Sequence, residues 1–220
     1  MIGILAYGSL LADPGPEIEA ATERRIESVQ TPFEVEYARS SAGRAGAPTL
    51  VRVANGKGSP VQAQIFILRP ETGEQEARNM LYRRETNRVG RRGVVYDESI
   101  QQQLSDAVLI GSLADVAGVS RVFYAHLGAN IDRILTGDLS AEEKARTLAK
   151  LAIDSVSERT YAERRDGIQY LRDAMRHSVQ TPLTEPYETA IRRMADHAPD
   201  LEAARLRIAQ CKGIILKEGE

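Results

Sequence analysis

The sequence predicts an α+β fold, because strand-like runs fill the first part of the chain and helical patterns fill the last part. Up to about residue 126, apolar residues alternate or gather in short runs, as in strands of a half-buried sheet. From Leu139 onward they recur at helical spacing. We therefore expect a curved, mixed or largely antiparallel sheet that forms a small barrel around one helix (residues 1–138), with a helical extension packed on it (residues 139–220).

The opening run is the first predicted strand. Residues Ile2 to Leu5 are apolar, and the run breaks at Gly8-Ser9. A glycine there can adopt backbone angles that other residues avoid, and it can leave backbone N–H groups available to a ligand. A strand that ends in a glycine turn is common in many folds, so this stretch alone identifies no function.

The next part of the chain is expected to form a loop followed by an antiparallel meander. Residues 12–31 contain two prolines and many acidic residues, which indicates a loop with a short exposed helix. Three β-rich runs separated by glycine-containing turns follow. They are residues 33–38, 48–53 and 61–68.

A helix is predicted from about Glu74 to Arg84, since its apolar residues fall at helical spacing. Glu85 lies near its end. The runs 93–96 and 120–126 then have strand character, which brings the sheet to roughly five to seven strands.

The tail begins with the capping-box sequence Ser140-Ala141-Glu142-Glu143. Helical patterns then extend to Ser157 and over residues 158–175, 187–197 and 201–210. We interpret the charge run of residues 163–166 as a solvated face.

Composition favours a small-molecule partner. Of the 220 residues 42% are hydrophobic and 27% charged, which is ordinary for a globular domain, and the net charge is −2. This balance offers no basic surface for nucleic acid or an anionic membrane. The first residues lack a basic leader and a cleavage site, and no apolar run approaches the ~20 residues that span a bilayer. We therefore expect a cytoplasmic protein.

No metal or other cofactor is expected. The three histidines, His126, His177 and His197, are scattered singly and have no cysteine or paired carboxylate at ligand spacing. The single cysteine, Cys211, is interpreted as a small core residue in a reducing compartment.

Two interpretations of Glu85 are open. It follows two arginines at the end of a helix, so a surface carboxylate paired with Arg84 or Arg88 is one interpretation. The other is functional, because a glutamate at a helix C-terminus is disfavoured by the helix dipole. The flanking strands would also project it toward the end of the sheet where the Gly8 turn lies.

The pairing of Ala6-Tyr7-Gly8-Ser9-Leu10 after a first strand with Leu81-Tyr82-Arg83-Arg84-Glu85 before a glycine-containing turn resembles the gamma-glutamyl cyclotransferase superfamily. Its ChaC-like branch is the closer match, since that branch carries a Leu-x-x-Arg-Glu pattern. The likeness covers roughly residues 1 to 130, and residues 166–171 in the tail also look ChaC-like.

The resemblance implies an enzyme that cleaves a gamma-glutamyl amide. The α-amino group of the substrate attacks its own γ-carbonyl and gives 5-oxoproline and a free amine. Glu85 would be the general acid and base, and the backbone N–H groups of Gly8, Ser9 and Leu10 would hold a carboxylate or the developing oxyanion. Tyr7 would line the cleft, and Tyr124 would hydrogen-bond the substrate. Arg44 is a weaker candidate for binding a substrate carboxylate.

The sequence departs from the family pattern after Glu85, where Thr86-Asn87-Arg88-Val89-Gly90-Arg91-Arg92 replaces glycines and an aromatic residue. Glutathione is therefore one candidate substrate among several gamma-glutamyl compounds. Asn87 would orient the substrate or cap the helix.

An alternative function is a non-catalytic protein of the same fold that binds a small anionic metabolite. Its binding groups would be an anion collar of five arginines. These are Arg83, Arg84, Arg88, Arg91 and Arg92. A third interpretation makes the helical tail an oligomerisation module, and a homodimer is compatible with either function.

Overall fold

The computed structural model describes residues 1–104 and 107–214. The chain divides into two compact units. The first, here called the sheet unit, comprises Met1–Glu34 and Pro60–Gly128. The second, the helical unit, comprises Val35–Ser59 and the chain from Ala129 onward. Residues 35–59 thus belong with the tail, although they lie within the first half of the chain.

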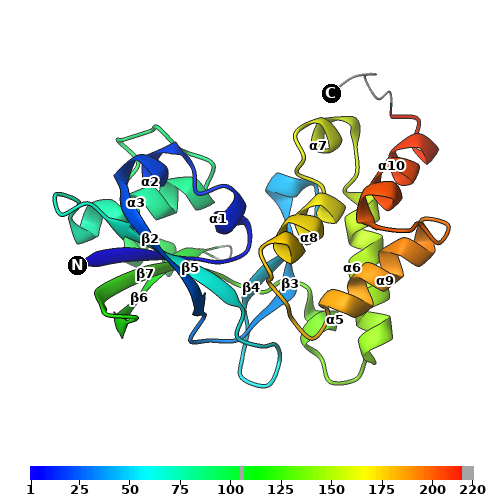
Figure 1. Cartoon of the computed structure of the whole chain (residues 1–220), viewed down its shortest axis with the longest axis horizontal. Coiled ribbons are helices and arrows are strands. Elements are labelled where there is room, and N and C mark those ends of the chain that lie inside the picture. Colours follow the sequence, from blue (N-terminus) through cyan, green and yellow to red (C-terminus); the bar gives the residue numbers. More distant parts are fainter. Residues whose placement is uncertain (105–106, 215–220) are drawn as a thin grey trace. The chain divides into compact units, whose positions relative to one another are not determined.

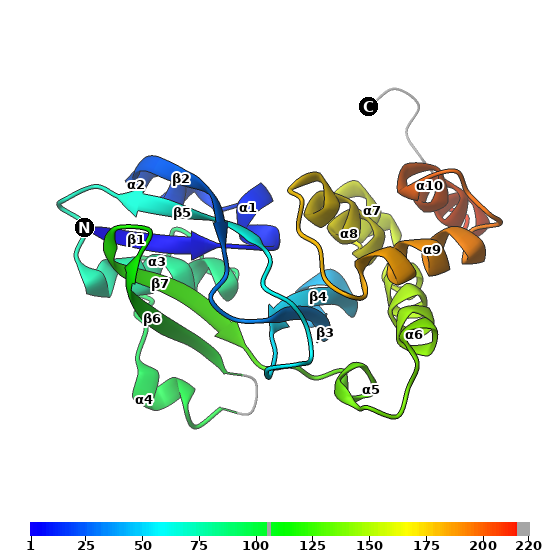
Figure 2. The same cartoon turned by 60° about the horizontal axis from the view of Figure 1, so that its bottom comes forward.

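The sheet unit is built on a mixed five-stranded sheet with the strand order β2-β5-β1-β7-β6. Strand β1 is parallel to β7, whereas the other neighbouring strands are antiparallel. Figures 1 and 2 show β1 lying between β5 and β7. The elements are β1 (Ile2–Ala6), α1 (Ser9–Ala12), α2 (Pro16–Ala21), β2 (Thr22–Gln30), β5 (Gln62–Leu68), α3 (Glu74–Glu85), α4 (Glu98–Gln101), β6 (Val108–Val116) and β7 (Val119–Leu127).

The predicted α+β class is confirmed, but the small barrel is not. Strands β2 and β6 stand at the two ends of the strand order and do not pair with each other in the part of the chain that the structure describes. The sheet is therefore open there. The predicted helix is present as α3, and β1 and β7 match two of the predicted strands.

Helix α3 packs on one face of the sheet, over β1, β7 and β6. Residues that lie opposite each other in neighbouring strands share a face, and Ile4 lies opposite both Phe66 and Phe123. All three side chains are fully buried. The guanidinium of Arg78 in α3 stacks 4.9 Å from the centre of the Phe123 ring, so this is the face on which α3 packs.

The expectation of a loop with one helix over residues 12–31 is wrong in its second half. Residues 22–30 form strand β2, which pairs with β5 and contains two register shifts. Most β2 residues are exposed, so the period-two apolar signal is missing. Charged residues are typical of an edge strand, where they oppose pairing with other chains.

The expected meander of residues 33–68 is also wrong. Strands β3 (Val35–Ser41) and β4 (Ala47–Arg52) form a separate two-stranded sheet in the helical unit. Strand β5 instead joins the large sheet between β2 and β1. Each run is a strand as expected, but alternation along a strand does not specify its partner.

The run 93–96 is not a strand. Val94 closes a turn onto the Arg91 carbonyl, and the Tyr96 N–H donates to Asn79 Oδ1 (2.9 Å). The sheet contains β6 instead, a strand that was not predicted from the sequence.

The helical unit contains the β3–β4 hairpin and the helices of the tail. The capping box at Ser140 is confirmed, since its hydroxyl accepts from the Glu143 N–H and the Glu143 carboxylate accepts from the Ser140 N–H. Besides the hairpin, the helical unit contains the 3₁₀ turn Ala42–Arg44, α5 (Asp132–Leu135), α6 (Ala141–Asp154), α7 (Glu158–Ala162), α8 (Gly167–Arg176), α9 (Thr184–Met194) and α10 (Leu201–Cys211).

The helix expected over residues 158–175 is divided in two, and its charge run is not a uniform solvated face. Asp166 is fully buried. One of its carboxylate oxygens accepts the first N–H groups of α8, from Ile168 and Gln169, and the other pairs with Arg205 at 2.7 Å. Asp166 is thus the N-cap that starts a new helix.

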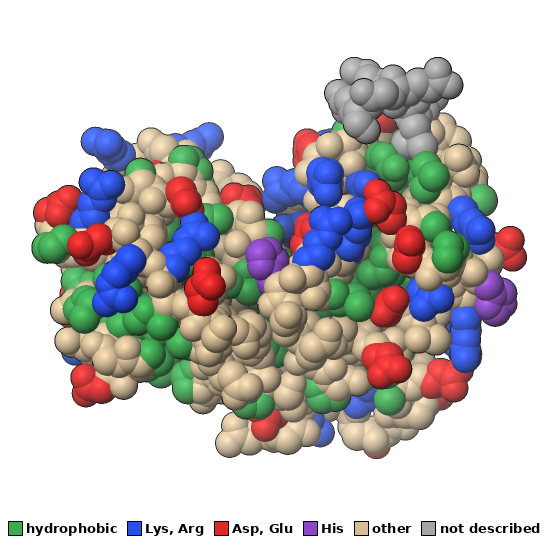
Figure 3. Space-filling view, viewed as in Figure 1, with side chains coloured by type: hydrophobic (Ala, Val, Ile, Leu, Met, Phe, Trp, Pro, Cys, Tyr) green, Lys and Arg blue, Asp and Glu red, His purple; other side chains and the backbone are tan. Residues whose placement is uncertain are grey.

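Cys211 is exposed and is not the core residue expected from the sequence. Basic and acidic side chains are interspersed on the face shown in Figure 3. Among the helices of the described residues, none combines the length and the apolar character needed to cross a bilayer.

Candidate functional site

Glu85 is the last residue of α3, and its side chain is largely covered, with 14% of its surface exposed. Its Oε1 atom accepts from Arg84 Nη1 at 2.8 Å. Its Oε2 atom makes no hydrogen bond to any described residue and is not fully buried. The ion pair with Arg84 matches one of the two interpretations of Glu85. The second carboxylate oxygen is still available to a ligand.

Arg84 connects Glu85 to the turn that follows β1. Its Nη1 atom donates to Ser9 Oγ (3.2 Å) as well as to Glu85, and its Nη2 atom donates to the Ser9 carbonyl (3.0 Å). Two further bonds from the guanidinium reach the Asp13 carbonyl, at 3.1 and 2.7 Å. The planar guanidinium of Arg84 thus connects the turn at Gly8-Ser9 with Glu85 at the end of α3, within the sheet unit.

The Gly8 turn has the backbone geometry that its sequence predicts. Gly8 has φ 58° and ψ −131°, in a region that glycine adopts without steric cost. Among the described residues, the N–H groups of Gly8 and Ser9 find no acceptor. The Leu10 N–H, in contrast, donates to the Tyr7 carbonyl at 3.3 Å. Two of the three predicted donors are therefore available, and Leu10 is engaged in closing the turn.

Tyr7 and Tyr124 meet through a third aromatic residue. The Phe33 ring packs edge-on against Tyr7 (centroids 5.7 Å apart) and at a tilt against Tyr124 (4.8 Å). The Tyr7 hydroxyl donates to the Ala125 carbonyl at 3.1 Å. Because Phe123 faces α3, the next residue, Tyr124, faces the other side of the sheet. Tyr124 thus lines a different face from the one that α3 covers.

Arg44 belongs to the helical unit, whereas the other predicted site residues belong to the sheet unit. Its guanidinium lies over the Tyr170 ring at 4.9 Å from the centroid. It also makes a long hydrogen bond to the Arg165 carbonyl (3.5 Å). These contacts account for its position within the hairpin turn, and a role in binding substrate stays a prediction.

The five arginines do not form one exposed collar. Arg83 is buried, with 1% exposed, and its guanidinium donates to Glu17, Glu76 and the Val94 carbonyl. Although burial alone would raise the pKa of the Glu17 carboxyl, the hydrogen bonds from Arg83 and from the Gly90 N–H lower it below its ordinary value. Arg84 is occupied as described above. The remaining three arginines, Arg88, Arg91 and Arg92, are exposed.

Asn87 closes α3. Its φ of 55° is left-handed, its N–H bonds the Arg84 carbonyl (3.3 Å), and the next N–H, from Arg88, bonds the Arg83 carbonyl (2.7 Å). This pair of bonds is the Schellman motif that ends many helices, and asparagine tolerates the left-handed position. The helix-capping interpretation of Asn87 is therefore confirmed.

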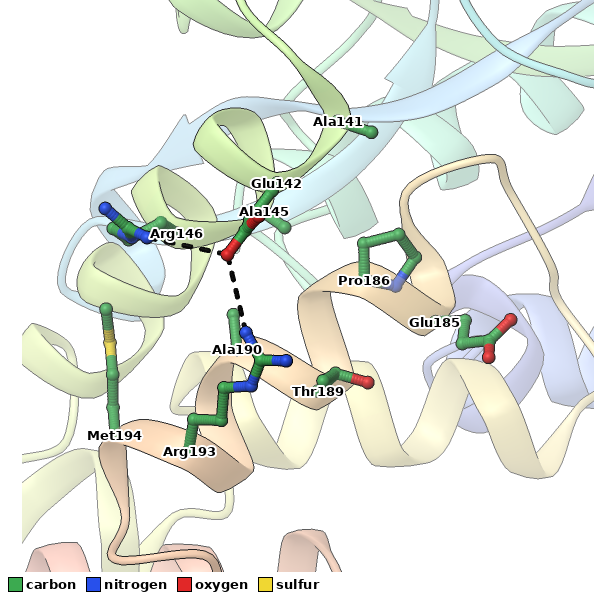
Figure 4. A pocket seen from close by; sticks show the side chains of 10 residues that line it. All are labelled: Ala141, Glu142, Ala145, Arg146, Glu185, Pro186, Thr189, Ala190, Arg193 and Met194. Carbon is green, nitrogen blue, oxygen red and sulfur yellow. Dashed lines mark hydrogen bonds and ion pairs between the residues drawn. The ribbon is translucent and has the colours of Figure 1, made fainter.

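A pocket of about 700 Å³ lies in the helical unit between α6 and α9 (Figure 4). Glu142 lies on one side of it and forms ion pairs with Arg146 and Arg193 at 3.5 and 3.4 Å. None of the predicted site residues lines this pocket. In the described ranges, no three histidine, cysteine, aspartate or glutamate side chains come together as a metal site.

Arg84, which joins Glu85 to the Gly8 turn, was predicted from the sequence only as an ion-pair partner of Glu85 and as part of the anion collar. No role was predicted for Gln64, whose side-chain oxygen is buried without a partner. In the sequence, Arg84 could have been assigned to the site from its position directly before the predicted catalytic residue Glu85. A polar residue in an otherwise apolar strand was the signal for Gln64.

Comparisons of the chain with models of protein families, with curated proteins and with solved structures found no match.

Proposed function

We propose that the chain is a gamma-glutamyl cyclotransferase, which releases 5-oxoproline from a gamma-glutamyl amide or peptide. The substrate is a small molecule, and glutathione is one candidate. The proposal includes a cytoplasmic location. It also includes the small barrel that the family resemblance implies, although β2 and β6 are not paired among the described residues.

The reaction is an intramolecular transfer that needs no nucleophile from the protein. The substrate α-ammonium loses a proton to the Glu85 carboxylate, and the resulting amine attacks the γ-carbonyl carbon. A five-membered ring closes as the amide C–N bond breaks, and Glu85 gives its proton to the leaving nitrogen. The ring nitrogen still carries two protons after the attack; it loses one of them to Glu85, which passes it to the free amine, and the amine departs as an ammonium ion. The products are 5-oxoproline and the free amine, and no water is consumed. Holding the substrate in its folded conformer supplies much of the acceleration.

The observation that carries the proposal is the bonding of Arg84 to both Glu85 and Ser9. It brings a carboxylate with one available oxygen close to the two unused N–H donors of Gly8 and Ser9. A site with an acceptor for the substrate ammonium and donors for a negatively charged oxygen suits a gamma-glutamyl group. In the free protein Arg84 holds Glu85 in place. Within the proposed complex, the available oxygen takes the proton.

The test is the variant Glu85→Gln. A glutamine can still accept from Arg84, so the fold is expected to persist, but it cannot take a proton. We expect 5-oxoproline release from an accepted gamma-glutamyl compound to fall by roughly 10²- to 10⁴-fold. The measurement is a screen of gamma-glutamyl compounds for 5-oxoproline, followed by kcat and KM for the best substrate.

Glu74→Gln is the matched control. Glu74 lies at the opposite end of the same helix, and among the described residues its side chain makes only a long ion pair with Arg121 (3.7 Å). This variant is therefore expected to retain full turnover. Full turnover in Glu85→Gln would show that Glu85 does not transfer the proton.

The second candidate function is binding of a small anionic metabolite without catalysis. The observation that favours it is the exposure of Arg88, Arg91 and Arg92 directly after Glu85. It predicts salt-sensitive ligand binding that is lost when these three arginines are replaced by glutamine. That binding would be retained in Glu85→Gln, and no 5-oxoproline would form.

A further inference from the structure

The side-chain amide of Gln64 is a polar group that the folded protein does not use. Its Oε1 atom is buried and has no hydrogen-bond partner, and within residues 1–104 and 107–214 its amide makes no hydrogen bond. Buried acceptors are nearly always paired in native proteins, because an unpaired one has lost its water without replacement. An unpaired acceptor therefore needs an explanation, and a ligand that donates to it is one.

The strand register places Gln64 beside the end of β1. In the antiparallel pairing of β1 with β5, Gln64 lies opposite Ala6, two residues before Gly8. Phe66, two residues further along β5, lies on the same face of the sheet as Phe123, the face on which α3 packs. Since side chains alternate along a strand, Gln64 shares that face with Phe66.

Helix α3 ends at the level of Gln64. Its first residue, Glu74, pairs with Arg121, which lies opposite Ile2 at the start of β1. Arg78 lies over Phe123, opposite Ile4. Glu85 follows Arg78 by seven residues, which is about 10 Å along a helix, or about three residues along a strand. Glu85 therefore lies near the level of Tyr7, on the face and at the end of the sheet where Gln64 lies.

The unused groups at this end of the sheet have complementary character. The N–H groups of Gly8 and Ser9 are donors without acceptors, and they suit a carboxylate or another negatively charged oxygen. The free oxygens of Glu85 and Gln64 are acceptors without donors, and they suit an ammonium group. An α-amino acid head carries both charges on neighbouring atoms.

We infer that Gln64 is a positioning residue that accepts a hydrogen bond from the α-ammonium group of the substrate. The inference rests on the proposed function for the identity of the substrate as a gamma-glutamyl compound. Gln64 holds the nitrogen through its neutral oxygen while Glu85 takes the proton. A substrate that lacks the α-amino group leaves the Gln64 acceptor unpaired, so Gln64 gives the site its selectivity for a free α-amine.

The test compares the binding of L-glutamate with that of glutarate, which has the same carbon chain and carboxylates but no amine. Calorimetry is done on the full chain and on Gln64→Met, which keeps the length of the side chain and removes the acceptor. We expect the wild type to prefer L-glutamate. In Gln64→Met the affinity for L-glutamate falls roughly tenfold to a hundredfold while that for glutarate stays unchanged, as for a hydrogen bond to a charged group.

Thermal unfolding separates this role from a structural one. Removal of an unpaired buried acceptor is not expected to lower the Tm of Gln64→Met. Gln101→Met is the matched control, because the amide of Gln101 bonds Tyr82 and the Val108 N–H at 3.0 and 3.2 Å. This control is expected to lower the Tm and to leave the preference for L-glutamate unchanged.

The outcomes distinguish this inference from the proposed function. If Gln64→Met loses the preference for L-glutamate but no gamma-glutamyl compound yields 5-oxoproline, the inference holds for an amino-acid site and the proposed reaction fails. Absence of a preference for L-glutamate in the wild type, or an equal change for both probes in Gln64→Met, overturns the inference. Release of 5-oxoproline in that case would leave the proposed function intact.

Discussion

Single residues decide how the side chains of the sheet unit are positioned, and Gly111 is a clear case. It lies opposite Tyr124 in the pairing of β6 with β7. A Cβ atom at this position would lie 2.5 Å from Cζ of Tyr124 and 2.6 Å from its hydroxyl oxygen. The tyrosine ring therefore crosses directly over the glycine, an arrangement in which the aromatic ring covers the strand that lacks a side chain.

Replacement of Gly111 by alanine should displace the Tyr124 ring from Phe33. We expect Gly111→Ala to lower the free energy of unfolding by about 1–3 kcal/mol, as for other overpacked positions. Denaturant unfolding measures the change. In a Tyr124→Ala background the same substitution should cost much less, since the clashing ring is gone. An equal cost in both backgrounds would mean that the ring is not the cause.

At the scale of elements, α3 connects most parts of the sheet unit. Arg84 and Arg83 are adjacent but project differently, the first to Ser9 and Glu85 and the second to Glu17 and Glu76. The Arg83 guanidinium links α2, α3 and the segment after α3, because Glu17 lies in α2 and Val94 lies in that segment. A planar group with five donors is suited to such a link, and an ammonium is not.

Substitution of Arg83 by lysine should therefore be destabilising even though the charge is kept. The lysine cannot satisfy the two glutamates and the Val94 carbonyl together, so we expect a loss of about 2 kcal/mol or more of unfolding free energy. Arg146→Lys is the control, since the ion pair of Arg146 with Glu142 is exposed and such pairs contribute little. Equal unfolding midpoints for both variants would contradict the role of Arg83.

The sequence predicted elements better than their pairing. Helix α3, the capping box of α6 and the strands β1 and β7 each carry a local signal, in periodicity or in capping residues, that spans few residues. Strand β2 carries none, because its side chains are mostly exposed. The sequence also does not show that β5 belongs to a different sheet from β3 and β4. The position of β5 is determined only by its pairing with β1 and β2.

At the scale of the whole molecule, the chain passes from the sheet unit to the helical unit and back before it ends in the tail. Glu36, in the hairpin that joins the helical unit early, is buried. Its carboxylate accepts from Thr181 Oγ1 (2.6 Å), the Tyr37 N–H (2.8 Å) and the Leu183 N–H (3.3 Å). It thus ties β3 to a segment about 145 residues later in the chain.

Burial raises the pKa of the Glu36 carboxyl to about 7, because the hydrogen bonds from Thr181, Tyr37 and Leu183 only partly offset the loss of water. The folded state therefore holds a proton that the unfolded state releases near its ordinary pKa of about 4.3. The contribution of Glu36 to stability is fully present below that value and is lost as the pH rises to about 7.

We expect the unfolding free energy to fall by a few kcal/mol between about pH 4.5 and 7. Glu36→Gln should reduce this slope, since an amide does not titrate, and Glu142→Gln, an exposed control, should not. The measurement is denaturant unfolding at several pH values. A slope that is the same in Glu36→Gln and in the wild type would contradict the assignment.

The sequence by itself determined the α+β class, the strand and glycine turn at the start, and the helix that ends at Glu85. These follow from local periodicity and backbone preference. Only the tertiary structure decided which strands pair, that residues 35–59 join the tail, and that Arg84 bonds both Ser9 and Glu85. The strand pairings and the bonds from Arg84 to Ser9 join residues far apart in the chain. They depend on the geometry of packed elements, which no local pattern encodes.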